Sequence, residues 1–306
     1  MATPRRRHSP GPISGAVVPP APSTIDLHAH TTRSDGVLEP IDLVEAAAAA
    51  GVHLFALTDH DTLAGYRDVA AADAVPETLT LLPGVEINAL VDRELGLWEG
   101  ELHIIGIGMD PFDDEFEALL EGQRDQRRIR FWRTVEKLRD IGSSIDAEVA
   151  ALDPADGDAL GRPTVARALV AAGHAANVED AFERLIGHGR PGYVRRSGLG
   201  PEEAIRAITS ARGLAVLAHF REAPGRVQLL RELIDVGLRG LEVHYRTFDA
   251  DTTAAVGATA DALGLVRTGG SDYHGDLGTY AEAHAGLWVP PAVGETLLER
   301  LEGRAG

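Results

Sequence analysis

The chain has 306 residues, of which 44% are hydrophobic and 25% charged, as in globular proteins that bury a sizeable core. It has no cysteine, which excludes disulfides and thiolate metal ligands and fits the reducing cytoplasm. No apolar run reaches the roughly 18 residues of a membrane span. The formal charge of −18 argues against binding long DNA, because affinity for a polymer depends on many phosphate contacts from basic residues.

The first 22 residues are rich in Pro, Gly and Ser and carry three consecutive arginines at positions 5–7. The apolar stretch after these arginines is short and is interrupted by Pro12, Pro19 and Pro20, unlike the apolar core of a secretion signal. We therefore predict a disordered tail over residues 1–22.

Strand-like and helix-like segments alternate from Ser23 onwards, which is typical of a mostly parallel sheet. The predicted strands cover residues 23–27, 54–58, 79–88 and 102–109, and the predicted helices cover 41–50 and 62–72. Residues 23–111 are therefore expected to form the first part of an α/β barrel.

The alternation stops at Phe112, and no strand pattern follows before about Ile186. Helices are predicted over residues 124–141, 163–172 and 178–186, with Gly173 and Gly187 as end signals. In the first of these helices the apolar positions expected to face inward are Ile129, either Phe131 or Trp132, Val135 and Leu138. Residues 112–193 are therefore predicted to be an all-helical insertion domain.

Alternation resumes near Gly200, so residues 194–306 are predicted to complete the barrel. The predicted helices cover residues 201–211, 227–236 and 251–263, with a last helix ending at Leu301. The predicted strands cover residues 214–219, 241–244, 265–268 and 286–289.

Six histidines and three carboxylates lie at or beside these strands. Strand ends in a barrel or open α/β sheet face a common crevice, so these side chains are expected to converge. Imidazoles and carboxylates without thiolates suit Zn, Mn or Fe ions in a hydrolytic site rather than a structural zinc. The nine candidates are His28, His30, Asp35, His60, Glu86, His103, His219, Asp272 and His274.

Local patterns support some of these candidates individually. His28 and His30 are two residues apart at a strand end, so their side chains share one face, although two surface histidines would look the same. Asp59, His60 and Asp61 follow a buried strand, where three ionisable groups are costly unless they are paired or bind a metal. We predict His60 as the ligand, with Asp59 and Asp61 orienting it or capping the next helix.

Glu86 lies within an apolar run, where a lone carboxylate must find a cation or lose its charge. Asp272 and His274 are again two residues apart, after a Gly-Gly pair that lets backbones approach closely. Of the remaining histidines, His244 is a candidate for orienting a metal ligand. The other five are predicted to be structural or surface residues: His8, His53, His174, His188 and His284.

These residues, in this order, resemble the polymerase-and-histidinol-phosphatase (PHP) family of metal-dependent phosphoesterases. The resemblance runs from Ser23 over the motifs at residues 26–31, 34–36, 57–62, 83–87, 103–106, 217–219 and 270–274. The segments at 123–128, 166–170 and 192–194 look like the bacterial branch that hydrolyses 3′,5′-nucleoside bisphosphates, some members of which also trim RNA from its 5′ end. The resemblance implies a distorted, TIM-like (β/α)7 barrel with two to three divalent ions, often Mn, Fe or Zn.

The resemblance also implies three ligand sets. One ion would be held by His28, His30, Glu86 and Asp272, a second by Glu86, His103 and His219, and a third by Asp35, His60 and His274. The residues of the third set are also predicted to be catalytic. Two departures from the family pattern, Thr164 in place of a histidine and Phe220 after His219, lie where the substrate pocket is expected.

The expected reaction is hydrolysis of a phosphate monoester by a metal-activated hydroxide, since bound metal lowers the pKa of water from about 15.7 to about 7. The predicted substrate is a small phosphorylated nucleotide, cleaved at the 3′-phosphate. Arg190 and Arg221 are candidates to bind a second phosphate, although both could be plain surface arginines, and Tyr193 is a candidate to contact the nucleotide.

Three rival functions remain open. The chain could be a 5′→3′ exoribonuclease acting on short RNA, or a histidinol-phosphate phosphatase. A non-catalytic metal-binding regulator belongs to a different class, and the complete ligand set argues against it. The identity of the metal, the physiological substrate and the oligomeric state stay undecided by the sequence.

Overall fold

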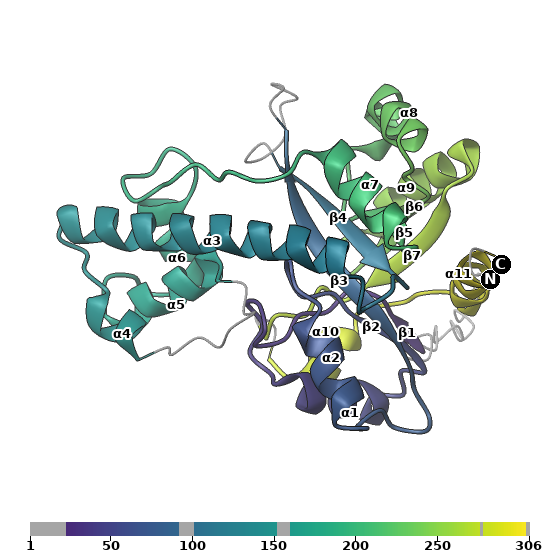
Figure 1. Cartoon of the computed structure of the whole chain (residues 1–306), viewed down its shortest axis with the longest axis horizontal. Helices are drawn as coiled ribbons and strands as arrows, with labels where there is room; N and C mark the ends of the chain where they lie inside the picture. Colours follow the sequence, from purple (N-terminus) through teal and green to yellow (C-terminus); the bar gives the residue numbers. More distant parts are fainter. Residues whose placement is uncertain (1–22, 92–100, 152–159, 276–277, 304–306) are drawn as a thin grey trace, which may run out of the picture.

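The computed structural model describes residues 23–91, 101–151, 160–275 and 278–303, so the predicted disordered tail over residues 1–22 lies outside the described residues. Seven strands form one sheet in which they follow one another in chain order (Figure 1). The strands are β1 (Ile25–Asp26), β2 (Leu54–Leu57), β3 (Thr80–Leu90), β4 (Glu101–Ile107), β5 (Leu214–Leu217), β6 (Gly240–Tyr245) and β7 (Val266–Gly270).

The sheet curls into a nearly closed barrel, as predicted. The backbone N–H of Leu27, just after β1, donates to the carbonyl of Gly269 in β7 over 3.1 Å, and Ala29 bridges Tyr273 in parallel. Four neighbouring strand pairs are parallel, whereas β4 runs antiparallel to both β3 and β5. The reversal of β4 follows from its connection, because no helix separates it from β3 in the described chain and a direct return produces an antiparallel pair.

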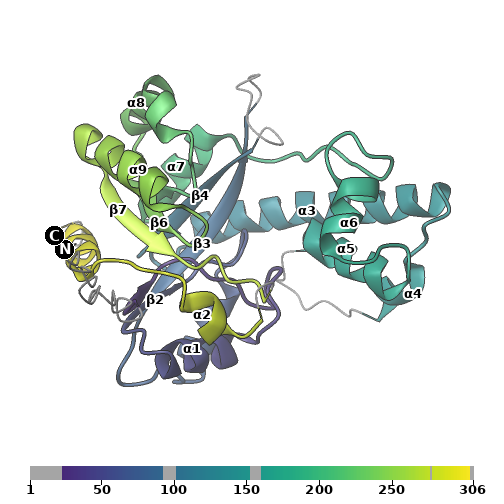
Figure 2. The same ribbon diagram turned by 180° about the vertical axis from the view of Figure 1, so that it is seen from behind.

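Helices surround the barrel on its outer side (Figures 1 and 2). They are α1 (Pro40–Ala49), α2 (Ala64–Ala71), α7 (Pro201–Ser210), α8 (Val227–Asp235), α9 (Ala250–Leu263), α10 (Tyr280–His284) and α11 (Pro291–Glu302), with a short 3-10 turn, η3 (Ala223–Gly225). In β2 the side chains alternate between two buried clusters, with Leu54 and Ala56 in one and Phe55 and Leu57 in the other. Both faces of this strand are therefore buried, which explains its continuous apolar sequence.

A helical segment lies between β4 and α7 and extends away from the barrel along the long helix α3 (Figure 1). It consists of α3 (Asp114–Asp140), α4 (Asp146–Ala150), α5 (Arg162–Ala171), α6 (Val178–Ala181) and a π-helical turn, η2 (Phe182–Ile186). It has a hydrophobic cluster of its own that includes Phe131, Leu138 and Leu169. Whether this segment is a domain in its own right, with the predicted bounds 112–193, remains a prediction.

Three details of the predicted elements were wrong. Helix α3 begins ten residues earlier than predicted, because the Asp113 side chain caps its first turn by accepting the N–H of Phe116 over 2.8 Å. Ile129 on α3, predicted to face inward, is 45% exposed, whereas of the alternatives Phe131 and Trp132 it is Phe131 that is buried, as the prediction allowed. Residues 286–289 are not a strand, although Leu287 and Val289 are buried there, because burial alone produces an apolar pattern without a neighbouring strand to pair with. No helix in the described ranges is long and apolar enough to cross a membrane.

Candidate metal centre

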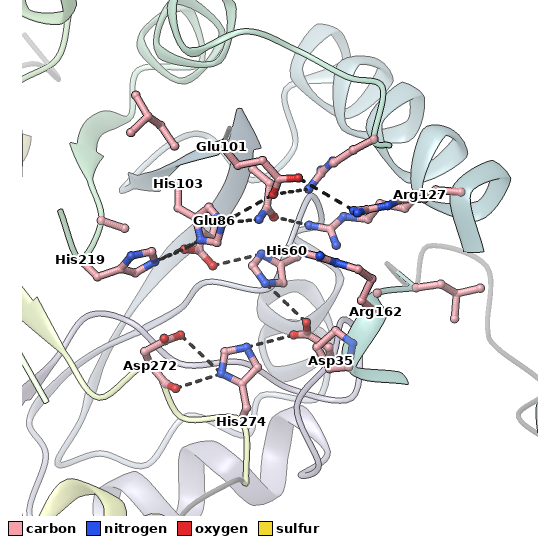
Figure 3. A pocket seen from close by; sticks show the side chains of 18 of the residues that line it. Asp35, His60, Glu86, Glu101, His103, Arg127, Arg162, His219, Asp272 and His274 are labelled. Atoms are coloured by element: carbon pink, nitrogen blue, oxygen red, sulfur yellow. Dashed lines mark hydrogen bonds and ion pairs between the residues drawn. The ribbon is translucent and has the colours of Figure 1, made fainter. Parts of the chain in front are cut away.

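The nine predicted ligands lie close together, and seven of them, all but His28 and His30, line one cavity (Figure 3). They form three groups in which the candidate ligand atoms all lie within 4.8 Å of one another, so each group could hold a metal ion. The groups are His28, His30, Glu86 and Asp272; Glu86, His103 and His219; and His30, Asp35, His60 and His274. These are the three predicted sets, with His30 added to the third. That the nine residues bind metal remains a proposal.

Glu86 on β3 lies at the centre of the cluster. Its Oε2 atom is 3.4 Å from Nε2 of His28 and 3.3 Å from Nε2 of His30. Its other oxygen, Oε1, is 2.9 Å from Nδ1 of His103 and 3.3 Å from Nε2 of His219. A single carboxylate therefore faces two of the groups at once, as a residue shared by two ions must.

Asp35 and Asp272 supply the other two carboxylates. Asp35 lies 3.5 Å from Nε2 of His60 and 3.2 Å from Nε2 of His274. Asp272 Oδ1 lies 3.3 Å from Nε2 of His28 and 3.2 Å from Nε2 of His30. Each imidazole thus has a carboxylate within reach, and the shortest of these separations is the 2.9 Å between His103 and Glu86.

Several imidazole nitrogens in this cluster are buried without a hydrogen-bond partner in the described structure: His28 Nε2, His30 Nδ1 and Nε2, and His60 Nδ1. An unpartnered polar atom is costly to bury, and nearly all such atoms in native proteins are satisfied. A divalent cation between these nitrogens and the carboxylates would remove that cost. The donor set of nitrogen and oxygen atoms therefore fits Mn, Fe or Zn.

Burial and charge act in opposite directions on the central carboxylate. Burial raises the pKa of Glu86, but the surrounding His103, His28 and His60 outweigh it and hold the pKa well below its usual range. Burial likewise lowers the pKa of His28, yet Asp272, Glu86 and Glu242 raise it well above the usual value. Glu86 is therefore held in its ionised form, which is the form of a carboxylate that binds a cation.

The backbone is strained at two predicted ligands. His219 and Asp272 adopt φ angles of 33° and 49°, in the left-handed region that residues with a β-carbon rarely occupy. Each lies just after its strand, and the N–H of Asp272 donates to the carbonyl of His28 over 2.7 Å. Such strain is kept where the surrounding structure requires one side-chain direction, which here is toward the cavity.

Glu242 on β6 is a supporting residue that sequence reasoning missed. Its Oε1 lies 3.1 Å from Nδ1 of His28, and its Oε2 accepts the backbone N–H of His219 over 2.7 Å. His244, the candidate for such a role in the sequence, does not line the cavity. Glu242, like Glu86, is a lone carboxylate in an apolar strand, and this pattern could have identified Glu242 from the sequence.

The two aspartates beside His60 play different roles, and neither caps a helix, because α2 begins only at Ala64 without a side-chain cap. Asp59 accepts the backbone N–H of Thr31 over 2.8 Å and the hydroxyl of Ser34 over 2.7 Å, which holds the loop that carries Asp35. Asp61 instead accepts hydrogen bonds from two arginines, Arg127 on α3 and Arg196, the second over 2.7 Å. Asp61 thereby ties the helical segment to the metal cluster.

The cavity has a volume of about 550 Å³, and four arginines line it together with the candidate ligands. This arginine wall consists of Arg127, Arg130, Arg162 and Arg196. Glu101 at the start of β4 lies between this wall and His103 (Figure 3). Burial, together with the nearby Arg162, lowers the pKa of Arg130 to about 10, so Arg130 is still charged at neutral pH.

The comparisons with known proteins agree with this geometry. The PHP domain family matches residues 26–185. A 3′,5′-nucleoside bisphosphate phosphatase from Chromobacterium violaceum is 33% identical to the chain over 267 residues, 82% of this chain and 87% of that protein. A 5′-3′ exoribonuclease from Haemophilus influenzae is 35% identical over 254 residues, 81% and 89% of the two chains. A crystal structure from Bifidobacterium adolescentis, described as a metal-dependent phosphoesterase, has a TM-score of 0.78 at 31% identity and covers 92% of this chain and 97% of that one.

The chain belongs to the PHP domain family. The relatives are named as enzymes that cleave phosphate esters, and this PHP protein is a phosphoester hydrolase of the same family. The names of the relatives give different phosphate esters as substrates.

The predicted substrate contacts of this PHP protein do not line the cavity in the described structure. Arg190 and Arg221 are exposed, and Arg221 packs over the ring of Phe248 at 5.5 Å. Tyr193 lies under the guanidinium of Arg130 at 5.8 Å, so it contacts the arginine wall from outside. The arginines that line the cavity lie instead on α3, at the start of α5 and just after the helical segment, which the sequence alone did not indicate.

Of the two departures from the family pattern, Phe220 lines the cavity beside His219, whereas Thr164 is buried in α5 and does not. Only Phe220 is therefore placed to change the shape of the pocket.

Proposed function

We propose that the chain hydrolyses nucleoside 3′,5′-bisphosphates, removing the 3′-phosphate and leaving the nucleoside 5′-monophosphate. One observation carries the proposal, namely that a single cavity is lined both by residues of the candidate ligand cluster and by four arginines. A substrate with two phosphates could use both the ligand cluster and the arginines, whereas a simple monoester would use only the ligand cluster.

In this proposal the nine clustered residues hold two to three divalent ions, with Mn, Fe or Zn as candidates. Such ions would stabilise charge on the phosphate and lower the pKa of water toward neutrality. Asp35, Glu86 and Asp272 keep the cluster anionic, while Asp59 and Glu242 hold the ligand-bearing loop and rings in place. His60, Asp35 and His274 line the cavity and would lie closest to the reacting phosphate.

The second phosphate would bind at the arginine wall, because guanidinium groups pair well with phosphate oxygens. Arg130 and Arg162 lie on the helical segment, and Phe131 and Phe182 line the same part of the cavity with apolar surface. These rings could pack against the nucleoside between the two phosphates. Arg190 and Arg221 are less well placed for this role, since neither reaches the cavity lining.

A second candidate is 5′→3′ exoribonuclease activity on short RNA, as named for the Haemophilus influenzae relative. The feature that favours it is a line of rings leading outward from the metal cluster. His219 lies 5.4 Å from Tyr245, Tyr245 lies 5.3 Å from Phe248, and Arg221 covers Phe248. Such a surface could stack the bases of a strand that continues beyond the cleaved bond.

The decisive experiment is a direct assay of the purified protein with Mn²⁺ on adenosine 3′,5′-bisphosphate, histidinol phosphate and a 5′-phosphorylated oligoribonucleotide. We expect the highest kcat/KM for the bisphosphate, with adenosine 5′-monophosphate as the product. Faster turnover of the oligonucleotide, with a steep loss at high salt, would favour the exoribonuclease. Bound metal without hydrolysis of any of the three would favour the regulator.

A further inference from the structure

Glu101 is an acidic residue in a wall that otherwise carries positive charge. Its side chain is only 7% exposed, and it lines the cavity together with Arg130, Arg196 and His103. An anionic substrate must therefore bind beside a carboxylate that already faces the same cations. A wall selected only for tight phosphate binding would not contain it.

The distances show that Glu101 does not hold these cations by hydrogen bonds. Its oxygens lie 3.9 Å from Nη1 of Arg130, 4.0 Å from Nη1 of Arg196 and 4.0 Å from Nε2 of His103. All three separations are beyond hydrogen-bond range, so the carboxylate acts on the wall through its charge.

Three of the four arginines in the wall make hydrogen bonds to residues other than Glu101. Arg196 donates to Asp61 over 2.7 Å, and Arg127 donates to the same carboxylate and to the side chain of Asn88. Arg130 donates through Nε to the carbonyl of Val194 over 2.9 Å. Removing Glu101 would therefore leave the positions of these arginines defined by other contacts.

Two nitrogen donors of the arginine wall make no hydrogen bond in the described structure. Nη2 of Arg130 and Nε of Arg196 are buried and have no hydrogen-bond partner in the part of the chain that the structure describes. A phosphate oxygen can use such donors, whereas Glu101 stays too far from them to do so.

We propose that Glu101 weakens the hold of the arginine wall on the phosphate that the product keeps, so that the nucleoside monophosphate can leave after hydrolysis. This inference rests on the proposed function. The carboxylate partly neutralises the wall and repels an incoming phosphate dianion, and a neighbouring charge in a partly buried site changes affinity roughly tenfold or more. Glu101 is thus an affinity-tuning residue and takes no part in the bond cleavage.

The test is the variant Glu101→Gln, which keeps the shape of the side chain and removes its charge. We expect it to bind adenosine 5′-monophosphate roughly five- to thirtyfold more tightly than the parent protein in Mn²⁺ by calorimetry. In steady-state assays on the bisphosphate we expect lower KM, stronger product inhibition and a kcat that is unchanged or reduced. A matched control is Glu202→Gln on α7, because Glu202 also pairs with an arginine at 3.9 Å, but on the exposed surface.

The two possible failures can be told apart. If the parent protein hydrolyses the bisphosphate but Glu101→Gln binds the monophosphate equally or more weakly, the assignment is wrong, and Glu101 anchors the arginines. If neither protein binds the monophosphate, the assignment is also overturned. Absence of bisphosphate hydrolysis by the parent protein counts against the proposed function, whatever the variant binds.

Discussion

Glu242 lies 3.1 Å from Nδ1 of His28, while Nε2 of the same ring faces Glu86 and Asp272. Glu242 therefore contacts Nδ1 of the imidazole, and the other nitrogen, Nε2, points toward the candidate metal position. Because the ring is fully buried, no water molecule from bulk solvent can replace this contact easily.

Glu242→Gln is expected to weaken metal binding roughly 10- to 100-fold, because partners of this kind fix the orientation and basicity of a ligating ring. Titration of the metal-free protein with Mn²⁺ measures the change. Glu232→Gln, an exposed glutamate on α8, serves as the control. Equal Mn²⁺ affinity in Glu242→Gln and parent would mean that Glu242 does not orient His28.

His60→Ala is expected to abolish turnover, with kcat lowered by more than roughly 100-fold, since a direct ligand should matter more than its supporting partners. The fold should persist, because the residue sits at a strand end beside a cavity. Phosphatase assays and circular dichroism measure the two effects, with the exposed His53→Ala as the control. Unchanged activity would refute the assignment of His60.

Removal of divalent metal by a chelator is expected to abolish activity and to lower Tm by roughly 5–10 °C, since a ligand that binds only the folded state stabilises it. Without cations, the unpartnered nitrogens of His28, His30 and His60 remain buried beside the carboxylates. Differential scanning calorimetry and activity should both recover on adding Mn²⁺. Full activity after exhaustive dialysis against chelator would argue against the metal proposal.

Asp61→Asn is expected to destabilise the protein by about 3–5 kcal/mol, because it leaves the guanidiniums of Arg127 and Arg196 buried without their carboxylate. Urea unfolding measures the loss. Asp146→Asn is the control, since Asp146 also pairs with an arginine, Arg139, but on the exposed surface, and no measurable change is expected there. A loss of stability in Asp61→Asn no larger than in this control would show that the ion pairs of Asp61 do not hold the helical segment in place.

His244 should make stability depend on pH in the acid range. Burial, together with the nearby Arg267, lowers its pKa from 6.5 to about 4. Because the folded-state pKa is the lower one, the unfolded chain binds the proton more readily, so stability is full above pH 6.5 and falls as the pH drops toward 4. Unfolding of His244→Gln should show a shallower loss over this interval than the parent and than His53→Gln. Parallel curves for all three proteins would exclude the effect.

The convergence of the nine candidate ligands could be predicted from the sequence because the patterns that indicate it are local. Polar residues directly after buried strands, such as His28 and Asp272, must face the end of the sheet, and ligands two residues apart share one face. The barrel was predictable for a related reason, since strand–helix alternation allows few arrangements. The reversed β4 was not predicted, because its direction depends on the connection between β3 and β4 rather than on its own residues.

The residue types fixed by the sequence alone determined the chemistry available here, namely nitrogen and oxygen donors at strand ends and no thiolate. Only the tertiary structure decided which arginines face the cavity, since Arg130 and Arg190 look equally suitable in the sequence and only Arg130 lines it. It also decided that Asp61 binds the helical segment and that Glu101 faces the arginines. These outcomes depend on how α3 packs against the barrel. That packing brings together residues far apart in the chain, and such contacts cannot be inferred from local sequence patterns.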